Sequence, residues 1–470
     1  MLSLLSRHRP FAVIIALALL VRAAVVLGYP PARLYWGDSF SYLDIALDLR
    51  PEPTLRPVGY PLFLRALAPL HSVAAVAVVQ HLIGVATGVL VYAVARRRSA
   101  PAWAANAATL PGLFGEGFLR LEHAILADTL FVFLIVAALA VVLWRTDLGH
   151  RAALAAGVLL AYATLVRTIG VLLIGVVIVV LTVALLLRRR GLRPLLTFAA
   201  AATLPLACYA AWYGTHHGRF AVSGADGVML WARTMTFADC AKIRPPADLA
   251  ALCPNGTVTD AASEYVWHPE SAVNLLPGGA FANNDRARGF ALRAIAAQPL
   301  DYLWHVAKDT SIAFRWTPEP HPDRTTPAFG FAHGRWDLPG VPLVERLRRD
   351  YAPDIGAMRS VSPYADLLIA YQYAAHLRGP VLLAVLVAGA LRPRRTLLPW
   401  AAAMTLLVGP VAVLDFDHRY VLPAIPVACL AAALAAVRRP TQLAFTEMSG
   451  FIASRKPSQD VARLKAVKGA

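Results

Sequence analysis

Charged side chains are scarce in this chain, and lysine is the rarest of them. Only 16% of the 470 residues are charged, whereas 58% are hydrophobic, and the mean hydropathy is +0.56. A soluble globular domain carries about 25% charged residues. This shortage of charge excludes an ordinary soluble domain and predicts an all-α, polytopic membrane protein.

Acidic residues are almost absent from one set of loops between the apolar runs. The N-terminus and these loops carry sixteen arginines and a single acid, Asp147. Because arginine-rich loops stay in the cytoplasm, this side is predicted to be cytoplasmic. The net charge of +17 is therefore explained by topology, and no nucleic-acid partner is expected. The arginine groups are 96–98, 188–190, 392–395 and 438–439.

The loops on the opposite side hold most of the acids outside the long polar segment. Carboxylates are costly near a bilayer, so a cluster of them on one face predicts a functional site there. These acids are Asp38, Asp44, Asp48, Glu52, Glu116, Glu122, Asp128, Asp415 and Asp417.

Ten apolar runs are predicted to cross the membrane, whose ~30 Å hydrocarbon core takes ~20 helical residues. The run 152–187 would measure ~54 Å as one helix, so it must fold back at TLVRTIG (164–170), its only polar interruption. Arg167 then lies in a tight turn on the acid-rich face. Both termini are expected inside the cell. The predicted spans are 11–28, 72–94, 101–116, 126–144, 152–166, 168–187, 194–213, 377–391, 397–414 and 420–437.

The chain divides into four parts by composition. We expect an N-terminal membrane module (1–214), a mainly helical extracytoplasmic segment (215–376), C-terminal membrane helices (377–440) and a cytoplasmic, disordered tail (441–470). The first apolar run lacks a small-residue cleavage site, so it is interpreted as a retained span and not as a signal peptide. Within the polar segment, 281–316 has helical periodicity, with Pro299 as a break.

Cysteine occurs only four times. Cys208 and Cys429 lie in apolar runs and are expected to be packing residues. Cys240 and Cys253 would form a disulfide if their segment is extracytoplasmic, but closeness in sequence does not establish the geometry, so the pairing stays open.

The first outer loop contains Asp38 at the start of a predicted helix. Gly37 permits a turn, and Asp38 or Ser39 can cap the helix that follows. The alternative to a purely capping role is a general base, since partial burial at the lipid boundary raises the pKa of a carboxylate.

The second outer loop carries Glu122, His123 and Asp128. Adjacent residues on a helix point in different directions, so Glu122 and His123 are a poor metal pair, and no metal site is predicted. Asp128, on the first turn of a span, is a stronger candidate.

Three arginines, Arg56, Arg167 and Arg419, are predicted on the same face as these acids. Each alone could extend its charge to the membrane surface. Together with Asp38 and Asp128 they indicate a site for a phosphate, because the guanidinium fork matches phosphate oxygens.

These motifs resemble the GT-C membrane glycosyltransferases, especially the bacterial enzymes similar to aminoarabinose–lipid A transferase and the protein O-mannosyltransferases. The resemblance implies a polyprenyl-phosphate-linked sugar donor, Asp38 as the catalytic residue and Asp128 as a second acid. It also implies Arg167, Arg419 and Arg56 as residues that bind the carrier phosphate. Tyr60, Glu122 and Tyr420, which lie in the same motifs, are predicted as further substrate-binding residues. Several relatives have paired acids where this chain has Asp38–Ser39, so no cofactor is expected and metal dependence stays open. The motifs are GDSFSY (37–42), RPVGYPLF (56–63), LEHAILADTLF (121–131), ATLVRTIG (163–170) and HRYVLPAIP (418–426).

The sequence therefore favours an inverting glycosyltransferase at the outer face of a bacterial cytoplasmic membrane. Asp38 would be its general base, and the acceptor could be a lipid, glycan, protein or metabolite. A transporter or lipid flippase is the alternative, although no repeated halves are seen. A non-catalytic scaffold would leave the outer acids unexplained.

Overall fold

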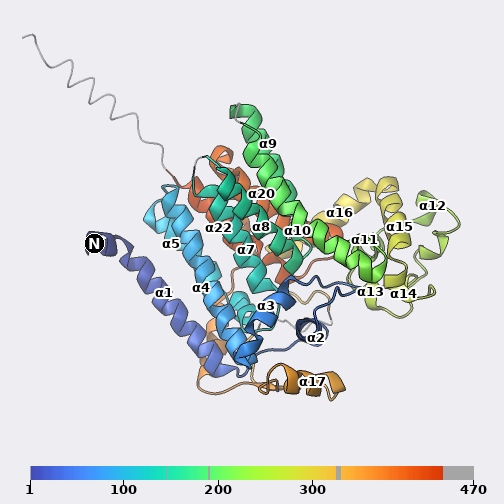
Figure 1. Cartoon of the computed structure of the whole chain (residues 1–470), viewed down its shortest axis with the longest axis horizontal. Coiled ribbons are helices and arrows are strands. Elements are labelled where there is room, and N and C mark those ends of the chain that lie inside the picture. Colours follow the sequence, from blue (N-terminus) through green and yellow to red (C-terminus); the bar gives the residue numbers. More distant parts are fainter. Residues whose placement is uncertain (1, 146, 189–190, 324–329, 438–470) are drawn as a thin grey trace, which may run out of the picture.

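Helices form most of the structure, a computed structural model that describes residues 2–145, 147–188, 191–323 and 330–437. The longer apolar helices stand side by side in one bundle (Figure 1). They are α1 (Leu2–Gly28), α4 (Val73–Arg97), α5 (Ala102–Phe114), α7 (Asp128–Leu143), α8 (His150–Val166), α9 (Gly170–Arg188), α10 (Arg193–His217), α19 (Gly379–Ala390), α20 (Pro393–Val413) and α22 (Ala424–Ala435).

Each of the ten predicted spans coincides with one of these helices, and the chain is a helical, multi-pass membrane protein. By length and composition, five described helices can cross a membrane, and α18 (Tyr364–Ala375) with α19 forms a sixth candidate bent by 50°. α7, α8 and α9 are apolar but shorter. The 16 residues of α7 cover ~24 Å. The count of ten crossings therefore stays a prediction.

Two short helices of the acid-rich loops, α2 and α3, lie at one end of the bundle near α17 (Figure 1). Asp354 fixes this end, because its carboxylate accepts hydrogen bonds from the Val73 and Ala74 amides at 2.8 and 3.1 Å and so caps α4. The short helices of the acid-rich loops are α2 (Asp38–Leu47), α3 (Gly59–Leu67), η1 (Ala68–Leu70), α6 (Glu116–Glu122) and α21 (His418–Val421), and α17 spans Pro342–Asp350.

The arginine-rich loops lie at the opposite end of the bundle. Arg97 reaches the Trp144 carbonyl at the end of α7, and Arg395 donates to the Val437 carbonyl after α22 at 2.9 Å. The segregation of charge predicted from the sequence is thus present at 96–98 and 392–395. Residues 189–190, 438–439 and the tail 441–470 lie outside the described residues.

A helical lobe with its own core extends from the side of the bundle (Figure 1). Trp231, Val228 and Phe290 are buried in that core. Cys240 and Cys253 form a disulfide, which is the pairing that the sequence left open. The expected break at Pro299 is confirmed, because α15 ends before it and α16 begins at it. The lobe comprises α11 (Asp226–Thr234), α12 (Cys240–Ile243), η2 (Ala250–Leu252), α13 (Glu264–Trp267), α14 (Gly279–Ala282) and α15 (Asn284–Ala297). The next two elements, α16 (Pro299–Thr310) and η3 (Ser311–Phe314), pack against the core of the bundle.

The end of the polar segment is shared between the lobe and the bundle. A short antiparallel ladder joins β1 (Arg335–Trp336) to β2 (Met358–Arg359). After it, α18 packs beside α1. Residues 364–375, which the sequence analysis assigned to the soluble segment, thus pack with the apolar bundle.

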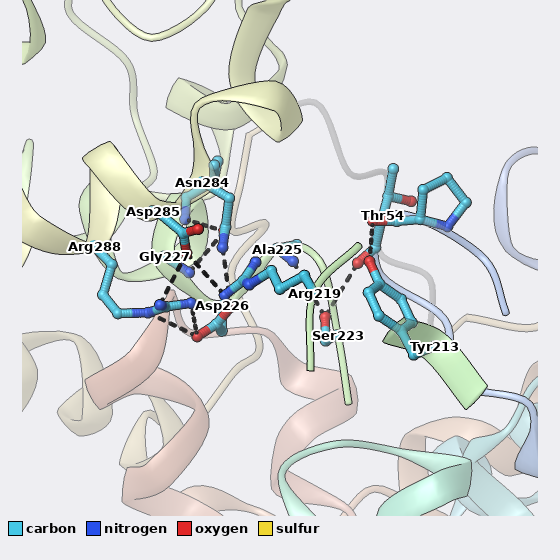
Figure 2. A network of polar contacts seen from close by, with 12 residues as sticks. Thr54, Tyr213, Arg219, Ser223, Ala225, Asp226, Gly227, Asn284, Asp285 and Arg288 are labelled. Carbon is cyan, nitrogen blue, oxygen red and sulfur yellow. Dashed lines mark hydrogen bonds and ion pairs between the residues drawn. The ribbon is translucent and has the colours of Figure 1, made fainter. Parts of the chain in front are cut away.

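Figure 2 shows two sets of polar contacts, one around Asp226 at the start of α11 and one that joins the chain before α11 to the loop between α2 and α3. In one, Asp226 accepts hydrogen bonds from Arg219 at 3.1 Å and from Arg288 at 2.5 Å. In the other, the Ser223 hydroxyl and the Gly224 amide donate to the Thr54 carbonyl at 3.1 and 3.0 Å. The loop that leads to Arg56 is therefore held by the chain that enters the lobe.

Candidate active site

Five of the predicted site residues come together at the acid-rich end of the bundle. They alternate in charge, in the order Arg56, Asp38, Arg419, Asp128 and Arg167. Each comes from a different part of the chain. In sequence order, Asp38 starts α2, Arg56 lies in the loop before α3, Asp128 starts α7, Arg167 lies in the α8–α9 turn and Arg419 lies in α21. We call this set the Asp38 cluster.

Asp38 binds two arginines, one with each carboxylate oxygen. Arg56 donates to Oδ1 from Nη2 at 2.8 Å and from Nε at 3.2 Å. Arg419 donates to Oδ2 from Nη1 at 3.2 Å. The Asp38 side chain is 31% exposed, so a ligand in solution or at the membrane surface can reach it.

Asp128 is the buried member of the Asp38 cluster, with a side chain only 3% exposed. Arg167 donates a hydrogen bond to its Oδ1. The Nε of Arg419 lies 4.0 Å from the same oxygen and is buried without a hydrogen-bond partner. Arg419 therefore lies between the two carboxylates and keeps an unused donor, a geometry suited to an added anion.

The start of α2 is positioned by its neighbours and not by the Asp38 side chain. Gly37 has φ +90°, which glycine adopts without strain. The Ser39 hydroxyl accepts from the Tyr35 amide at 2.9 Å and donates to the Ile125 carbonyl at 2.9 Å. Asp38 makes no capping hydrogen bond, so the purely capping role is not supported, and its carboxylate is left to face the arginines.

Acidic neighbours position two of the arginines. Glu52 accepts hydrogen bonds from the amides of Thr54, Leu55 and Arg56 at 2.9 to 3.1 Å, which orders the loop that carries Arg56. Asp417 accepts from the Arg419 amide at 2.8 Å and caps α21. The tight turn predicted at Arg167 is confirmed, since α8 ends at Val166 and α9 begins at Gly170.

Aromatic rings form one wall of the Asp38 cluster. The guanidinium carbons of Arg167 and Arg419 lie 4.9 and 5.6 Å from the centre of the Tyr420 ring. Arg56 lies 6.0 Å from the ring of Tyr42, a residue that the sequence analysis did not select. Such cation–π contacts orient the guanidinium groups. The only sequence signal for Tyr42 is its place one helical turn after Asp38.

The pKa of Asp38 is shifted in the direction opposite to the one expected from the sequence. Burial alone would raise it, but the charges and hydrogen bonds of Arg419 and Arg56 lower it to about 2. The expectation of a raised pKa was wrong because it considered the lipid boundary and not the two arginines. In this state Asp38 is fully ionised and only weakly basic.

Glu122 and Tyr60 lie outside the Asp38 cluster, in a buried network. Glu122 accepts from Arg22 at 2.7 Å and lies 2.9 Å from His81 Nδ1. His81 Nε2 is in turn 3.3 Å from His123 Nδ1. The Tyr60 hydroxyl donates to Gln80 at 2.8 Å. The substrate-binding roles assigned to Glu122 and Tyr60 stay predictions, and the structure brings neither side chain to the cluster.

Arg22, His81 and Gln80 were missed by the sequence analysis as partners of Glu122. The sequence contained a signal for them, because each is a polar residue inside an apolar run, and such residues need polar partners. Gly84 makes room for the network, since a Cβ there would lie 1.8 Å from Glu122 Oε1.

An apolar cavity of about 30 Å³ reaches Asp128 from inside the bundle. Val91, Ala108, Leu422 and Pro426 are among its lining residues, and Glu122 lines it as well as Asp128. The cavity therefore lies between the Asp38 cluster and the Glu122 network. Among the described residues, no group of three or more His, Cys, Asp or Glu side chains is arranged to hold a metal ion.

Known families show similarity to part of this chain. Residues 68–218 match the model of the dolichyl-phosphate-mannose-protein mannosyltransferase family. This region contains Glu122, Asp128 and Arg167, but neither Asp38 nor Arg419. No curated protein sequence matches the chain.

Several solved structures are similar at low identity, and three of them follow. The S. cerevisiae protein O-mannosyltransferase Pmt1–Pmt2 complex bound to the sugar donor is 17% identical, over 44% of this chain and 34% of that chain, with a TM-score of 0.33. The Archaeoglobus fulgidus oligosaccharyltransferase is 14% identical, over 94% and 51%, with a TM-score of 0.41. ArnT from Cupriavidus metallidurans bound to undecaprenyl phosphate is 15% identical, over 96% and 82%, with a TM-score of 0.35.

The chain thus spans about a third of the yeast protein and half of the archaeal one. At these TM-scores, the overlap does not support a transfer of individual residue roles. What the family match confirms is the resemblance predicted from the sequence: this helical, multi-pass membrane protein is similar to the GT-C glycosyltransferases, and its residues 68–218 match their protein mannosyltransferase family.

Proposed function

We propose that this protein is a membrane glycosyltransferase that moves a sugar from a polyprenyl-phosphate carrier to an acceptor at the outer face of a bacterial cytoplasmic membrane. One observation carries the proposal: Arg419 lies between Asp38 and Asp128 with a buried, unused Nε donor. The family match over 68–218 supports the lipid-linked class of donor.

In this proposal the carrier phosphate binds between Arg167 and Arg419. Both guanidinium groups already point toward one carboxylate, Asp128, and stack near the Tyr420 ring. The apolar cavity beside Asp128 would lead toward the hydrocarbon chain of the carrier. Arginine pairs are well suited to a phosphate on which charge develops as the bond to the sugar breaks.

Asp38 would act as general base for the acceptor hydroxyl. The hydroxyl proton moves to Asp38 while the oxygen attacks the anomeric carbon. The bond between that carbon and the phosphate oxygen then breaks, and the electron pair leaves with the phosphate. A single displacement of this kind inverts the anomeric centre. Base assistance of this type is worth about 10²–10⁴ in rate.

Donor binding would also activate the base. The pKa of Asp38 is near 2 because burial is outweighed by Arg419 and Arg56. A phosphate that draws Arg419 to itself weakens the larger of these two effects, so the carboxylate becomes more basic once the donor is bound. Asp38 would therefore gain strength as a base in the loaded enzyme.

Replacing Asp38 by Asn tests the catalytic role. In a deletion strain, a polyprenyl-phosphate-linked sugar should accumulate, and mass spectrometry of membrane lipids identifies it. The wild-type gene should clear this lipid, whereas Asp38→Asn should leave it at the level of the deletion while the protein stays in the membrane. The expected loss of rate is about 10²–10⁴-fold.

Asp48→Asn is the matched control, because Asp48 follows the same helix but is 66% exposed and binds only Arg50. It should clear the lipid as the wild type does. Near-normal clearance by Asp38→Asn would remove the general-base role. If the deletion accumulates no lipid-linked sugar, the transporter interpretation gains support.

Cysteine labelling tests the orientation of the chain. In a background with Cys208 and Cys429 replaced by Ser, single cysteines near residues 98 and 394 should be protected from an impermeant reagent in intact cells. Cysteines near residues 45 and 260 should react. Protection at 260 together with reaction at 394 would place the Asp38 cluster on the cytoplasmic face and overturn the proposed donor side.

A further inference from the structure

A second small cavity on the outer face is lined by two arginines and by no acid. It lies between the loop after α1, helix α6 and the β1 segment, and has a volume of about 30 Å³. Arg33 and Arg120 line it, together with Tyr29, Tyr35 and Trp336. None of its lining residues belongs to the Asp38 cluster. We call it the Arg33–Arg120 site.

Both arginines have a guanidinium nitrogen without a partner. Among the described residues, nothing forms a hydrogen bond with the buried Nη1 of Arg33 or with that of Arg120. Burial lowers the pKa of Arg120, and the nearby charge of Arg33 lowers it further. Arginine nevertheless stays protonated in proteins. Two like charges with buried, unused donors are costly unless an anion joins them.

The nearest acids are already engaged elsewhere. Glu116 lies 2.7 Å from His376 Nδ1, and Asp366 lies 3.2 Å from His333 Nε2. Neither carboxylate lines the cavity. The nearby charge of Glu116 favours the protonated form of Arg120 and so raises its pKa in part, but among the described residues no ion pair joins Arg33 or Arg120 to a carboxylate.

The walls of the cavity hold Arg33 in place. Its guanidinium carbon lies 5.2 Å from the centre of the Tyr35 ring and 5.1 Å from that of Trp336. The Tyr29 hydroxyl donates to the Ala332 carbonyl at 3.2 Å, and His123 Nε2 lies 2.7 Å from the Tyr29 carbonyl. Arg33 is thus held in place before an anion binds, which lowers the entropic cost of binding.

We propose that the Arg33–Arg120 site binds a phosphate group. A guanidinium donates paired hydrogen bonds to phosphate oxygens, and two of them match a doubly charged phosphate. A volume of about 30 Å³ has room for about two water molecules. The cavity therefore admits one or two oxygens of a phosphate and leaves the rest of the group and its bearer outside. That bearer is either a soluble phosphate compound or the headgroup of an anionic lipid.

Binding of inorganic phosphate to the purified full-length protein tests the site. With the protein in phosphatidylcholine nanodiscs, calorimetry should detect saturable binding that Arg33→Gln and Arg120→Gln each weaken about 10- to 100-fold, the usual effect of losing charge-assisted hydrogen bonds. Arg335→Gln is the matched control, because Arg335 adjoins Trp336 but is 72% exposed and pairs with Asp337. It should leave the affinity unchanged.

A further variant separates this site from the Asp38 cluster, which also contains arginines. Arg419→Lys should retain the phosphate binding that Arg120→Gln loses. If a Gln variant does not fold, Arg120→Lys takes its place, and its loss of the forked contact should still weaken phosphate about tenfold. These measurements need no sugar transfer, so they stand apart from the proposed catalytic function.

A second experiment, with an anionic lipid, distinguishes a lipid headgroup from a soluble phosphate compound as the natural ligand. Nanodiscs with added phosphatidic acid should raise the thermal midpoint of the wild type, and not of the Arg33→Gln/Arg120→Gln double variant, if a lipid headgroup is the natural ligand. If the natural ligand is a soluble phosphate compound, inorganic phosphate should raise the thermal midpoint of the wild type, and phosphatidic acid should not. The proposal fails if the wild type binds neither probe, or if the double variant binds both as well as the wild type does.

Discussion

The Asp38 cluster and the Glu122 network are built from the same kinds of residues but differ in burial and in geometry. Glu122 and Arg22 have side chains that are 2% and 3% exposed, and Glu122 uses both oxygens on fixed partners, Arg22 and His81. In the Asp38 cluster, Asp38 is 31% and Arg419 is 24% exposed. Arg419 and Arg22 each keep a buried Nε with no hydrogen-bond partner among the described residues, so exposure and not the unused donor separates the two regions.

This difference separates an ion pair that holds helices together from one that can receive a ligand. The Glu122 network joins α1, α4 and α6 inside the bundle, where removing one partner would leave an uncompensated charge. The Asp38 cluster joins loop and helix ends, where a substrate can replace one carboxylate at an arginine. Substitutions in the two regions should therefore fail in different ways.

The largest effect on stability is expected for Glu122→Gln. The change keeps the shape of the side chain but leaves Arg22 buried without its counter-charge, which costs about 3–5 kcal/mol. Thermal unfolding in nanodiscs should show a markedly lower midpoint, while the surviving folded protein transfers sugar at a near-normal rate. Asp38→Asn should show the reverse, with normal unfolding and no transfer.

Glu345→Gln is the control for this prediction, since Glu345 is 71% exposed on α17. Its unfolding midpoint should match that of the wild type. If Glu122→Gln unfolds normally but loses transfer, Glu122 contacts substrate, as the sequence analysis predicted, and the contrast between the two regions disappears.

A smaller effect is expected when an arginine of the Asp38 cluster is replaced by lysine. Arg167→Lys and Arg419→Lys keep the charge but lose the paired contact to a phosphate. The concentration of lipid-linked donor that gives half the maximal rate should rise by about tenfold, as expected for the loss of one charge-assisted hydrogen bond. Transfer kinetics at varied donor concentration measure this shift.

Arg65→Lys is the matched control, because Arg65 lies at the same end of the bundle but donates only to the Ala46 and Leu47 carbonyls. It should leave the donor dependence unchanged. Unaltered kinetics in both cluster variants would mean that these arginines do not bind the phosphate, and would favour the transporter interpretation.

The smallest effect is a pH-dependent one at the junction between the lobe and α21. His321 Nε2 lies 3.1 Å from Asp415. Burial alone would lower the pKa of His321, but the hydrogen bond and charge of Asp415 raise it above 6.5. The pKa of Asp415 is lowered, because hydrogen bonds from His321 and Ser263 outweigh its burial.

The signs of these two shifts define a window. The raised pKa of His321 contributes stability that is fully present below pH ~6.5 and is lost as the pH rises through the pKa of His321 in the folded protein. The lowered pKa of Asp415 contributes stability that is lost in acid. His321→Gln should therefore lower the free energy of unfolding most near pH 5–6, by on the order of 1 kcal/mol, and little at pH 9. An equal effect at both pH values would mean that the pair contributes no charge interaction.

Helix positions and the acid-rich face were predictable because they depend on local properties of the chain. The apolar runs coincide with the helices, and TLVRTIG forms the turn that places Arg167. The convergence of Asp38, Asp128, Arg56, Arg167 and Arg419 also followed from topology. Their pairing did not, because hydrogen bonds between residues as far apart as Asp38 and Arg419 depend on how helices pack.

Glu122 shows most clearly what the sequence could not provide. It is six residues from Asp128 and on the same predicted loop, so position alone suggested a shared site. Its side chain instead turns toward Arg22 and His81, 100 and 41 residues away. Hydrophobicity and charge along the chain determined that this is a membrane protein with its acids on one face. Only tertiary packing decided which acids form buried, fixed ion pairs and which stay accessible to a ligand. The cost of burying a charge depends on the partners that the fold supplies.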